Sequence, residues 1–284
     1  MIVIKKLLLL ILLFPLVAAC QEDTETPQNN VSSIQVIGAN GSMTRTENRV
    51  VITLRDGYEY VNDVKAVKVK AQDIQMEGDP TVWEGSATGY TDYEVPYWVF
   101  YPEIPRSGSW LFALEIEREN GKKETATFGT NFWDAPLGLT AGQPAIASET
   151  RTATTEEEIK AISSDTTPNL AFYEQTIADA LGNGKPTLIA FTTPGFCTSQ
   201  LCSPVMNTFD ALYEQYQGDF NFIHVEVHSD FETLAYVPAM EEWGLVNEPW
   251  IYVIDQDGMI AARYDGPVSV TEITPAIEGV LDAS

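Results

Sequence analysis

The stretch FTTPGFCTSQLCSPVM at residues 191–206 carries two of the three cysteines of the chain, Cys197 and Cys202. Two thiols this close in sequence can form a disulfide if their Cα atoms lie within about 7 Å of each other. On a regular helix, residues five positions apart lie roughly 8–9 Å apart, which is beyond that limit. A bond between Cys197 and Cys202 therefore requires that the segment between them is not a regular helix. The chemistry that such a pair could perform is thiol–disulfide exchange.

Both histidines of the chain lie in the motif F-I-H-V-E-V-H, where His224, Glu226 and His228 alternate with valines. Because residues two apart on a strand point to the same side, we expect these three polar side chains to share one strand face. His228 could tune the ionisation of Cys197 or, with both cysteines, bind a soft metal such as copper. The alternative, which we favour, is that the polar groups are satisfied by the backbone or by one another. We therefore predict no metal site and no cofactor.

An α/β pattern surrounds these residues and continues to the C-terminus. The apolar run at 186–192 is typical of a strand that is buried on both faces. Ser203 followed by Pro204 is typical of a helix start, and Ser269 with Glu272 indicates a capping box. The predicted elements are strands at 170–173, 186–192, 220–227, 250–254 and 259–264, the last two joined by an Asp-Gly turn, and helices at 177–181, from 203, at 238–244 and from 269.

This order of elements, the buried strand that enters Cys197 and the proline in N-E-P-W resemble the thioredoxin fold over residues 169–284. The motif T-P-x-x-C-x-x-x-x-C-x-P-V is similar to that of a subgroup of exported bacterial thioredoxin-like domains. The resemblance implies an α/β domain with a mixed sheet flanked by helices. It also implies that Cys197 is the attacking thiolate, that Cys202 is the resolving partner and that Pro249 is a cis-proline beside the active cysteine. Glu248 would help Pro249 to shape the substrate groove.

The resemblance allows two registers for the helix after the buried strand. In the first, Cys197 begins the helix, whose N-terminus would lower the pKa of the thiol, and Pro204 lies at a kink. In the second, Cys202-Ser-Pro-Val overlays the Cys-Gly-Pro-Cys of the family, with valine in place of the resolving cysteine. The distance from the end of the preceding strand favours the first register. The chain departs from the family in having Phe196 rather than tryptophan before the first cysteine, and Ala190 where the family has a buried acid.

The N-terminus resembles a bacterial lipoprotein signal. Lys5 and Lys6 precede an apolar run at 7–14, and V-A-A stands directly before Cys20. The run is short for a bilayer span, and polar residues follow it at once. The resemblance to a lipobox implies cleavage of a signal peptide at 1–19 and a lipid on the sulfur of Cys20. Such an anchor would hold the protein in the cell envelope, on the extracytoplasmic side of a membrane. The alternative is an ordinary signal peptide.

The chain of 284 residues is strongly acidic, with a formal net charge of −25 at pH 7. This excess of negative charge argues against nucleic acid and anionic membrane surfaces as partners. The hydrophobic fraction of 44% is normal for a globular protein, so the acidity belongs to the surface rather than to disorder. If Cys20 is lipidated, Cys197 and Cys202 form the one remaining pair, in an oxidising compartment.

Residues 33–133 show a different pattern, of short strands with regular turns and no long helical period. This pattern predicts an all-β, immunoglobulin-like sandwich, with a hairpin at Asn120-Gly121. We interpret the aromatic cluster of Tyr93, Tyr97, Trp98, Phe100 and Tyr101 as packing, and a partner-binding face is the alternative. The predicted organisation is a signal peptide at 1–19, a lipid-anchored tether at 20–32, the sandwich at 33–133, a linker at 134–168 and the thioredoxin-like domain at 169–284.

Three hypotheses for the function follow from these features. The first is a membrane-anchored, extracytoplasmic thiol–disulfide oxidoreductase, whose partners are exported thiol or disulfide proteins and a membrane redox protein. The second is a non-enzymatic binding or assembly lipoprotein of the cell envelope, in which Cys197–Cys202 is a structural disulfide. A copper-binding or metallochaperone role is a minor third hypothesis.

Overall fold

The computed structural model describes residues 32–78, 80–196 and 203–283, and the part from Ser32 onward forms one compact unit. The predicted signal peptide, nearly all of the tether and all three cysteines lie outside the described residues. Within the described ranges, no helix combines the length and the apolar character that crossing a membrane requires. The domain boundaries stay a prediction.

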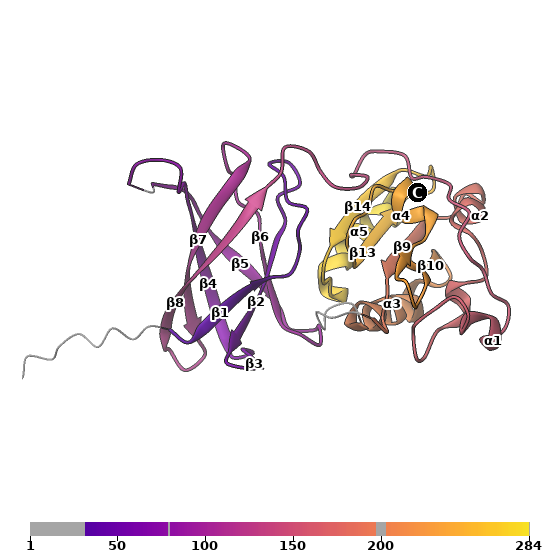
Figure 1. Cartoon of the computed structure of the whole chain (residues 1–284), viewed down its shortest axis with the longest axis horizontal. Helices are drawn as coiled ribbons and strands as arrows, with labels where there is room; N and C mark the ends of the chain where they lie inside the picture. The colour runs from indigo at the N-terminus through magenta and orange to yellow at the C-terminus, as the bar shows by residue number, and fades with distance from the viewer. Residues whose placement is uncertain (1–31, 79, 197–202, 284) are drawn as a thin grey trace, which may run out of the picture. The chain divides into compact units, whose positions relative to one another are not determined.

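The first half of the described chain is all β, as predicted (Figure 1). Its strands form one antiparallel sheet in the order β1-β2-β6-β5-β4-β7-β8, and β3 pairs with β2. The predicted Asn-Gly turn joins β7 to β8. The strands are β1 (Ile34–Gly38), β2 (Val50–Asp56), β3 (Glu59–Tyr60), β4 (Val64–Gln72), β5 (Thr81–Tyr90), β6 (Tyr97–Phe100), β7 (Gly108–Arg118) and β8 (Lys123–Phe132).

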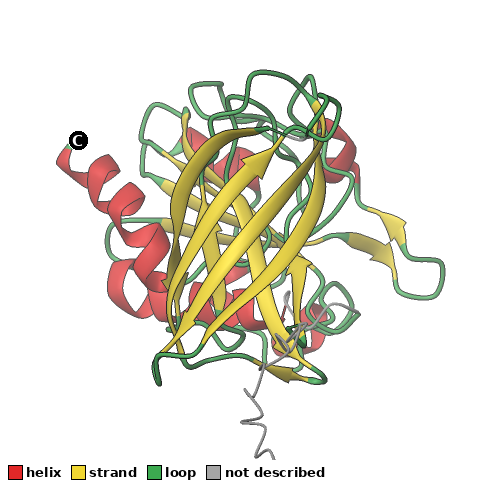
Figure 2. Ribbon diagram, turned by 90° about the vertical axis from the view of Figure 1, so that its left-hand side faces the viewer, coloured by secondary structure: helices red, strands yellow, loops and turns green. Residues whose placement is uncertain are grey.

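This sheet curls around a single hydrophobic core, as a sandwich does, and it is nearly closed because β1 lies beside β8 (Figure 2). Strand β5 joins the part of the sheet that contains β1, β2 and β6 to the part that contains β4, β7 and β8. Its residues 81–87 pair with β4, and its residues 88–90 pair with β6. Four of the five clustered aromatic residues are buried and only Tyr101 is exposed, which confirms the packing interpretation for those four.

The second half contains a mixed sheet in the order β10-β9-β13-β14, which confirms that part of the prediction. β9 is parallel to β10 and antiparallel to β13, and β13 and β14 form the predicted hairpin. The strands are β9 (Thr187–Thr192), β10 (Asn221–Glu226), β13 (Trp250–Ile254) and β14 (Ile260–Asp265), and a separate two-stranded sheet consists of β11 (His228–Asp230) and β12 (Ala235–Tyr236).

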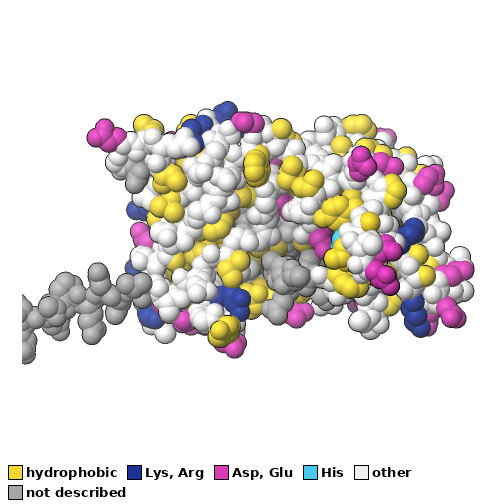
Figure 3. Space-filling view, viewed as in Figure 1, with side chains coloured by type: hydrophobic (Ala, Val, Ile, Leu, Met, Phe, Trp, Pro, Cys, Tyr) yellow, Lys and Arg dark blue, Asp and Glu magenta, His cyan; other side chains and the backbone are white. Residues whose placement is uncertain are grey.

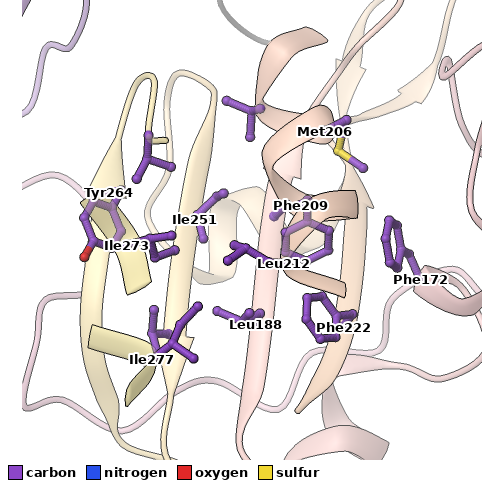
Figure 4. Close-up of a cluster of buried hydrophobic side chains, with 14 of the residues drawn as sticks. Phe172, Leu188, Met206, Phe209, Leu212, Phe222, Ile251, Tyr264, Ile273 and Ile277 are labelled. Atoms are coloured by element: carbon purple, nitrogen blue, oxygen red, sulfur yellow. The ribbon is translucent and has the colours of Figure 1, made fainter. Parts of the chain in front are cut away.

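Helices cover both faces of the mixed sheet. On one face, α3 (Ser203–Tyr216) and α5 (Val270–Asp282) contribute Phe209, Leu212 and Ile277 to a core with Leu188 and Ile251 (Figure 4). On the other face, α2 (Ile177–Gly182) and α4 (Pro238–Glu242) pack with the alternate residues of β9 and β13. Burial on both faces explains why the sequence of β9 is a continuous apolar run. A helical turn, α1 (Glu156–Ile159), lies in the predicted linker.

Two predicted strands differ from the structure. The strand predicted at 170–173 is a 3-10 helix, η1 (Leu170–Phe172), because the side chain of Asn169 caps it by accepting a hydrogen bond from the Ala171 N–H. The strand predicted at 220–227 ends at Glu226, and His228 begins β11, which pairs with β12. His228 therefore does not lie on the same strand as His224 and Glu226, contrary to the prediction.

The capping box predicted at the start of α5 is only half formed. Ser269 Oγ accepts a hydrogen bond from the Glu272 N–H, but the Glu272 carboxylate binds elsewhere. Arg49, directly before β2, donates to both carboxylate oxygens of Glu272 at 2.7 Å. The Tyr97 hydroxyl donates to the same carboxylate at 2.6 Å, and the Arg49 guanidinium also binds the carbonyl oxygen of Asp265. The Arg49 guanidinium thus binds the carboxylate that would otherwise complete the capping box.

Candidate functional site

The candidate site lies where β9 ends. All six residues of β9 are buried, and the chain leaves the strand through Thr193, Pro194, Gly195 and Phe196. The described chain resumes with α3 at Ser203. Both cysteines therefore belong to the connection between β9 and α3. The choice between the two helix registers rests on Cys197–Cys202, which lie outside the described residues.

Glu248 stands beside the beginning of this connection. Its carboxylate accepts a hydrogen bond from the Thr193 N–H. Burial raises the pKa of Glu248 to about 7, the hydrogen bond from Thr193 opposes that change, and the charge of Glu226 adds to it. Glu248 is therefore poised to exchange a proton near neutral pH. The peptide bond between Glu248 and Pro249 is cis, in agreement with the resemblance stated above.

Glu226 is a buried carboxyl group at the same end of the sheet. One of its oxygens accepts hydrogen bonds from the N–H and the hydroxyl of Ser164, at 2.8 and 2.6 Å. The other oxygen is buried and has no partner among the described residues. A cavity of about 90 Å³ lies beside Glu226, with Arg151 and Tyr173 among its lining residues. It has room for water that could reach the carboxyl group.

Ser164 connects Glu226 to the segment that leads to the cysteines. Its hydroxyl oxygen accepts a hydrogen bond from the Gly195 N–H at 3.0 Å and lies 3.3 Å from the hydroxyl of Thr193. The two backbones approach so closely that a Cβ atom on Gly195 would lie 2.6 Å from the carbonyl oxygen of Ser164. Ser164 lies in the predicted linker, where no local sequence pattern marks it as a site residue.

His224 is buried and held by two hydrogen bonds. Its Nε2 atom donates to the carbonyl oxygen of Thr192 at 3.1 Å, which leaves Nδ1 to accept from the Tyr173 hydroxyl at 2.6 Å. Burial lowers the pKa of His224, so the ring is neutral. For His224, the interpretation as a satisfied buried side chain is confirmed.

His228 has a different environment. Its ring stacks on Tyr236, with 5.4 Å between the ring centroids, and its carbonyl oxygen accepts a hydrogen bond from Arg151. The Nδ1 atom is buried and has no partner among the described residues. Within those residues no group of three or more His, Cys, Asp or Glu side chains is arranged to hold a metal ion.

Three of the predicted site residues lie in segments near the end of the mixed sheet. Glu248 contacts Thr193, Pro249 follows it, and Phe196 lies on the connection that starts at Thr193. Phe196 is 43% exposed and stacks on Phe231, with 5.3 Å between the ring centroids. The predicted residues Cys197, Cys202 and Cys20 lie outside the described part of the chain.

No family model and no curated protein matches the chain. Among solved structures, the chain is similar to a thiol:disulfide interchange protein of the thioredoxin family from Chlorobium tepidum TLS, at 15% identity and a TM-score of 0.32, over 52% of this chain and 99% of that one. It is also similar to CopC from Methylosinus trichosporium OB3b, at 12% identity and a TM-score of 0.24, over 34% of this chain and 88% of that one. A third is a copper-bound variant of FetP from uropathogenic Escherichia coli strain F11, at 8% identity and a TM-score of 0.25, over 37% and 89%. At these scores the similarities carry no argument.

Proposed function

We propose that this protein is a membrane-anchored, extracytoplasmic, thioredoxin-like thiol–disulfide oxidoreductase that acts on exported proteins. The observation that carries the proposal is the environment of the chain where it leaves β9 for the two cysteines. Two carboxyl groups, the buried Glu226 and the partly buried Glu248, flank this point, and neither forms an ion pair within the described residues. A carboxyl group whose pKa is raised by burial, as that of Glu248 is, is typical of functional sites.

In the reducing direction, the Cys197 thiolate attacks one sulfur of a substrate disulfide. The substrate S–S bond breaks, and a mixed disulfide and a substrate thiolate form. Cys202, as a thiolate, then attacks the Cys197 sulfur and releases the second substrate thiolate, which leaves a Cys197–Cys202 disulfide. Each released thiolate takes up a proton, and Glu248, with a pKa of about 7, is suited to supply one at neutral pH.

The remaining parts of the proposal rest on sequence and topology. The sheet order β10-β9-β13-β14, with β9 parallel to β10, supports a thioredoxin-like domain at 169–284. The antiparallel strands around one core support an immunoglobulin-like sandwich at 33–133. The lipid anchor on Cys20, and with it the place in the cell envelope, is proposed from the lipobox-like residues alone.

Two other functions are alternatives to this one. If Cys197–Cys202 is a stable structural disulfide, the protein is a non-enzymatic envelope lipoprotein. If the buried Nδ1 atom of His228, which lacks a partner within the described part of the chain, joins the cysteines, a copper site results.

The deciding experiment is the reduction potential of the chain from Gln21 onward, measured by glutathione titration with thiol counting. A potential between about −120 and −270 mV supports an exchange catalyst, and one below about −300 mV indicates a structural disulfide. A Cys202→Ser variant should accumulate mixed disulfides with substrates, whereas Cys197→Ser should not. Titration with Cu(I) alone, with His228→Ala as the comparison, tests the metal hypothesis separately.

A further inference from the structure

An apolar pocket lies next to the candidate site. It has a volume of about 520 Å³ and is lined by residues of β12, α4 and the turn after α4, among them Tyr236, Pro238, Glu241, Leu245 and Val246. Tyr236 is 50% exposed and Val246 is 60% exposed. The volume falls within the usual range of ligand pockets.

The walls of this pocket are held in place by contacts within the protein. The ring of Tyr236 stacks on His228, and its hydroxyl donates to the carbonyl oxygen of Val246 at 3.4 Å. At the tip of the same hairpin, Phe231 stacks on Phe196, which directly precedes Cys197 in the sequence. The large apolar side chains of the pocket are therefore already ordered, so a ligand does not need to fix them when it binds.

Among the described residues that line the pocket, only Glu241 is charged. Between Lys185 and Arg263 the sequence contains no lysine or arginine, but eleven aspartate and glutamate residues. Glu241, which lines the pocket, is exposed and forms no ion pair within the described part of the chain. On the face seen in Figure 3, hydrophobic side chains lie beside acidic ones over the second half of the chain, and a few Lys or Arg side chains are also present there. A carboxylate without an ion-pair partner beside apolar walls favours a ligand that is both cationic and apolar.

We propose that this pocket binds an extended peptide segment in which apolar side chains alternate with lysine or arginine. The apolar side chains occupy the space between Tyr236 and Val246, and the cations lie against Glu241. A second copy of this chain fits poorly, because each copy has a formal net charge of −25. Binding requires no thiol chemistry, so it stands or falls independently of the proposed redox function.

The test uses the chain from Gln21 onward with both remaining cysteines replaced by serine, which removes redox reactions from the measurement. Binding of three fluorescent ten-residue peptides is followed by anisotropy: alternating leucine and lysine, alternating leucine and glutamate, and alternating serine and lysine. The variants are Val246→Ser and Glu241→Lys. Their matched controls are Val82→Ser, at an exposed valine of β5, and Glu278→Lys, at an exposed glutamate of α5. Far-ultraviolet circular dichroism checks that each variant is folded.

We expect only the leucine–lysine peptide to bind. Val246→Ser should weaken it roughly fivefold through lost apolar burial. Glu241→Lys should weaken it roughly tenfold at low salt and less at high salt. The proposal is overturned if the leucine–glutamate or the serine–lysine peptide binds equally well, or if both variants behave like their controls. It is also overturned if the chain instead self-associates and Val246→Ser abolishes that association.

Discussion

Replacing Glu248 by glutamine tests whether a buried, proton-exchanging acid stands beside the connection to the cysteines. Glutamine keeps an oxygen that can accept the hydrogen bond from the Thr193 N–H, but it removes the ionisable group. In the folded protein, burial is the main cause that raises the pKa of Glu248 from 4.5 to about 7. At about 1.4 kcal/mol per pKa unit, this difference corresponds to about 3 kcal/mol of stability.

The sign of the effect follows from proton binding. Between about pH 4.5 and pH 7 the unfolded chain has released this proton and the folded chain has retained it, so stability falls as the pH rises. Below this range the stability is not reduced, and above it the reduction in stability is complete. The free energy of unfolding of Glu248→Gln should therefore equal that of the original chain at pH 4 and exceed it by about 3 kcal/mol at pH 8.

Urea unfolding at pH values from 4 to 8 measures this difference, and subtracting the two curves cancels the titration of most other groups. Glu278→Gln, at an exposed position on α5, should follow the original chain throughout. A difference between Glu248→Gln and the original chain that stays below about 0.5 kcal/mol at every pH would refute the reasoning, because a carboxyl group so easily ionised is not buried in the way described.

Two further substitutions test the packing that positions the site. Gly195→Ala should destabilise the protein by about 1–3 kcal/mol in urea unfolding, because its Cβ atom meets the carbonyl oxygen of Ser164, whereas Gly218→Ala, with open space around it, should change little. Equal effects of the two would contradict the close approach. Arg49→Met should cost about 3–5 kcal/mol, because it leaves the buried carboxylate of Glu272 without its cationic partner, and adding Glu272→Gln should recover part of the loss. A loss from Arg49→Met below about 1 kcal/mol would mean that water replaces the guanidinium.

Local patterns were sufficient to predict the elements that carry the site. The run at 186–192 is apolar on both sides because helices cover both faces of β9, and the Asp-Gly turn before β14 forms through Gly258 at a φ of 76°. The helix predicted from Ser203 is present as α3, which the structure describes from Ser203 onward. Each of these features is marked by a pattern of residues that lie within a few positions of one another in the sequence.

The contacts that were not predicted join residues far apart in the chain. Glu272 has the right spacing for a capping box, but Arg49, 223 positions away, binds its carboxylate. Ser164 lies in a segment whose composition is typical of a linker, and its partner Glu226 is 62 positions away. The extent of a strand is equally a tertiary property, since His228 leaves the sheet to pair with Tyr236. Such partners depend on register and packing, which periodicity does not specify.

One electrostatic feature connects the buried acids with the surface pocket. Thr193, Phe196, Glu226 and Glu248 all lie between residues 186 and 262. This stretch contains no lysine or arginine. Glu248 therefore has no cation of this stretch to stabilise its ionised form, and burial raises its pKa. The same lack of cations leaves Glu241 uncompensated at the pocket. A cationic peptide bound there would bring positive charge towards Glu248 and lower its pKa, so peptide binding should couple to proton release at the site.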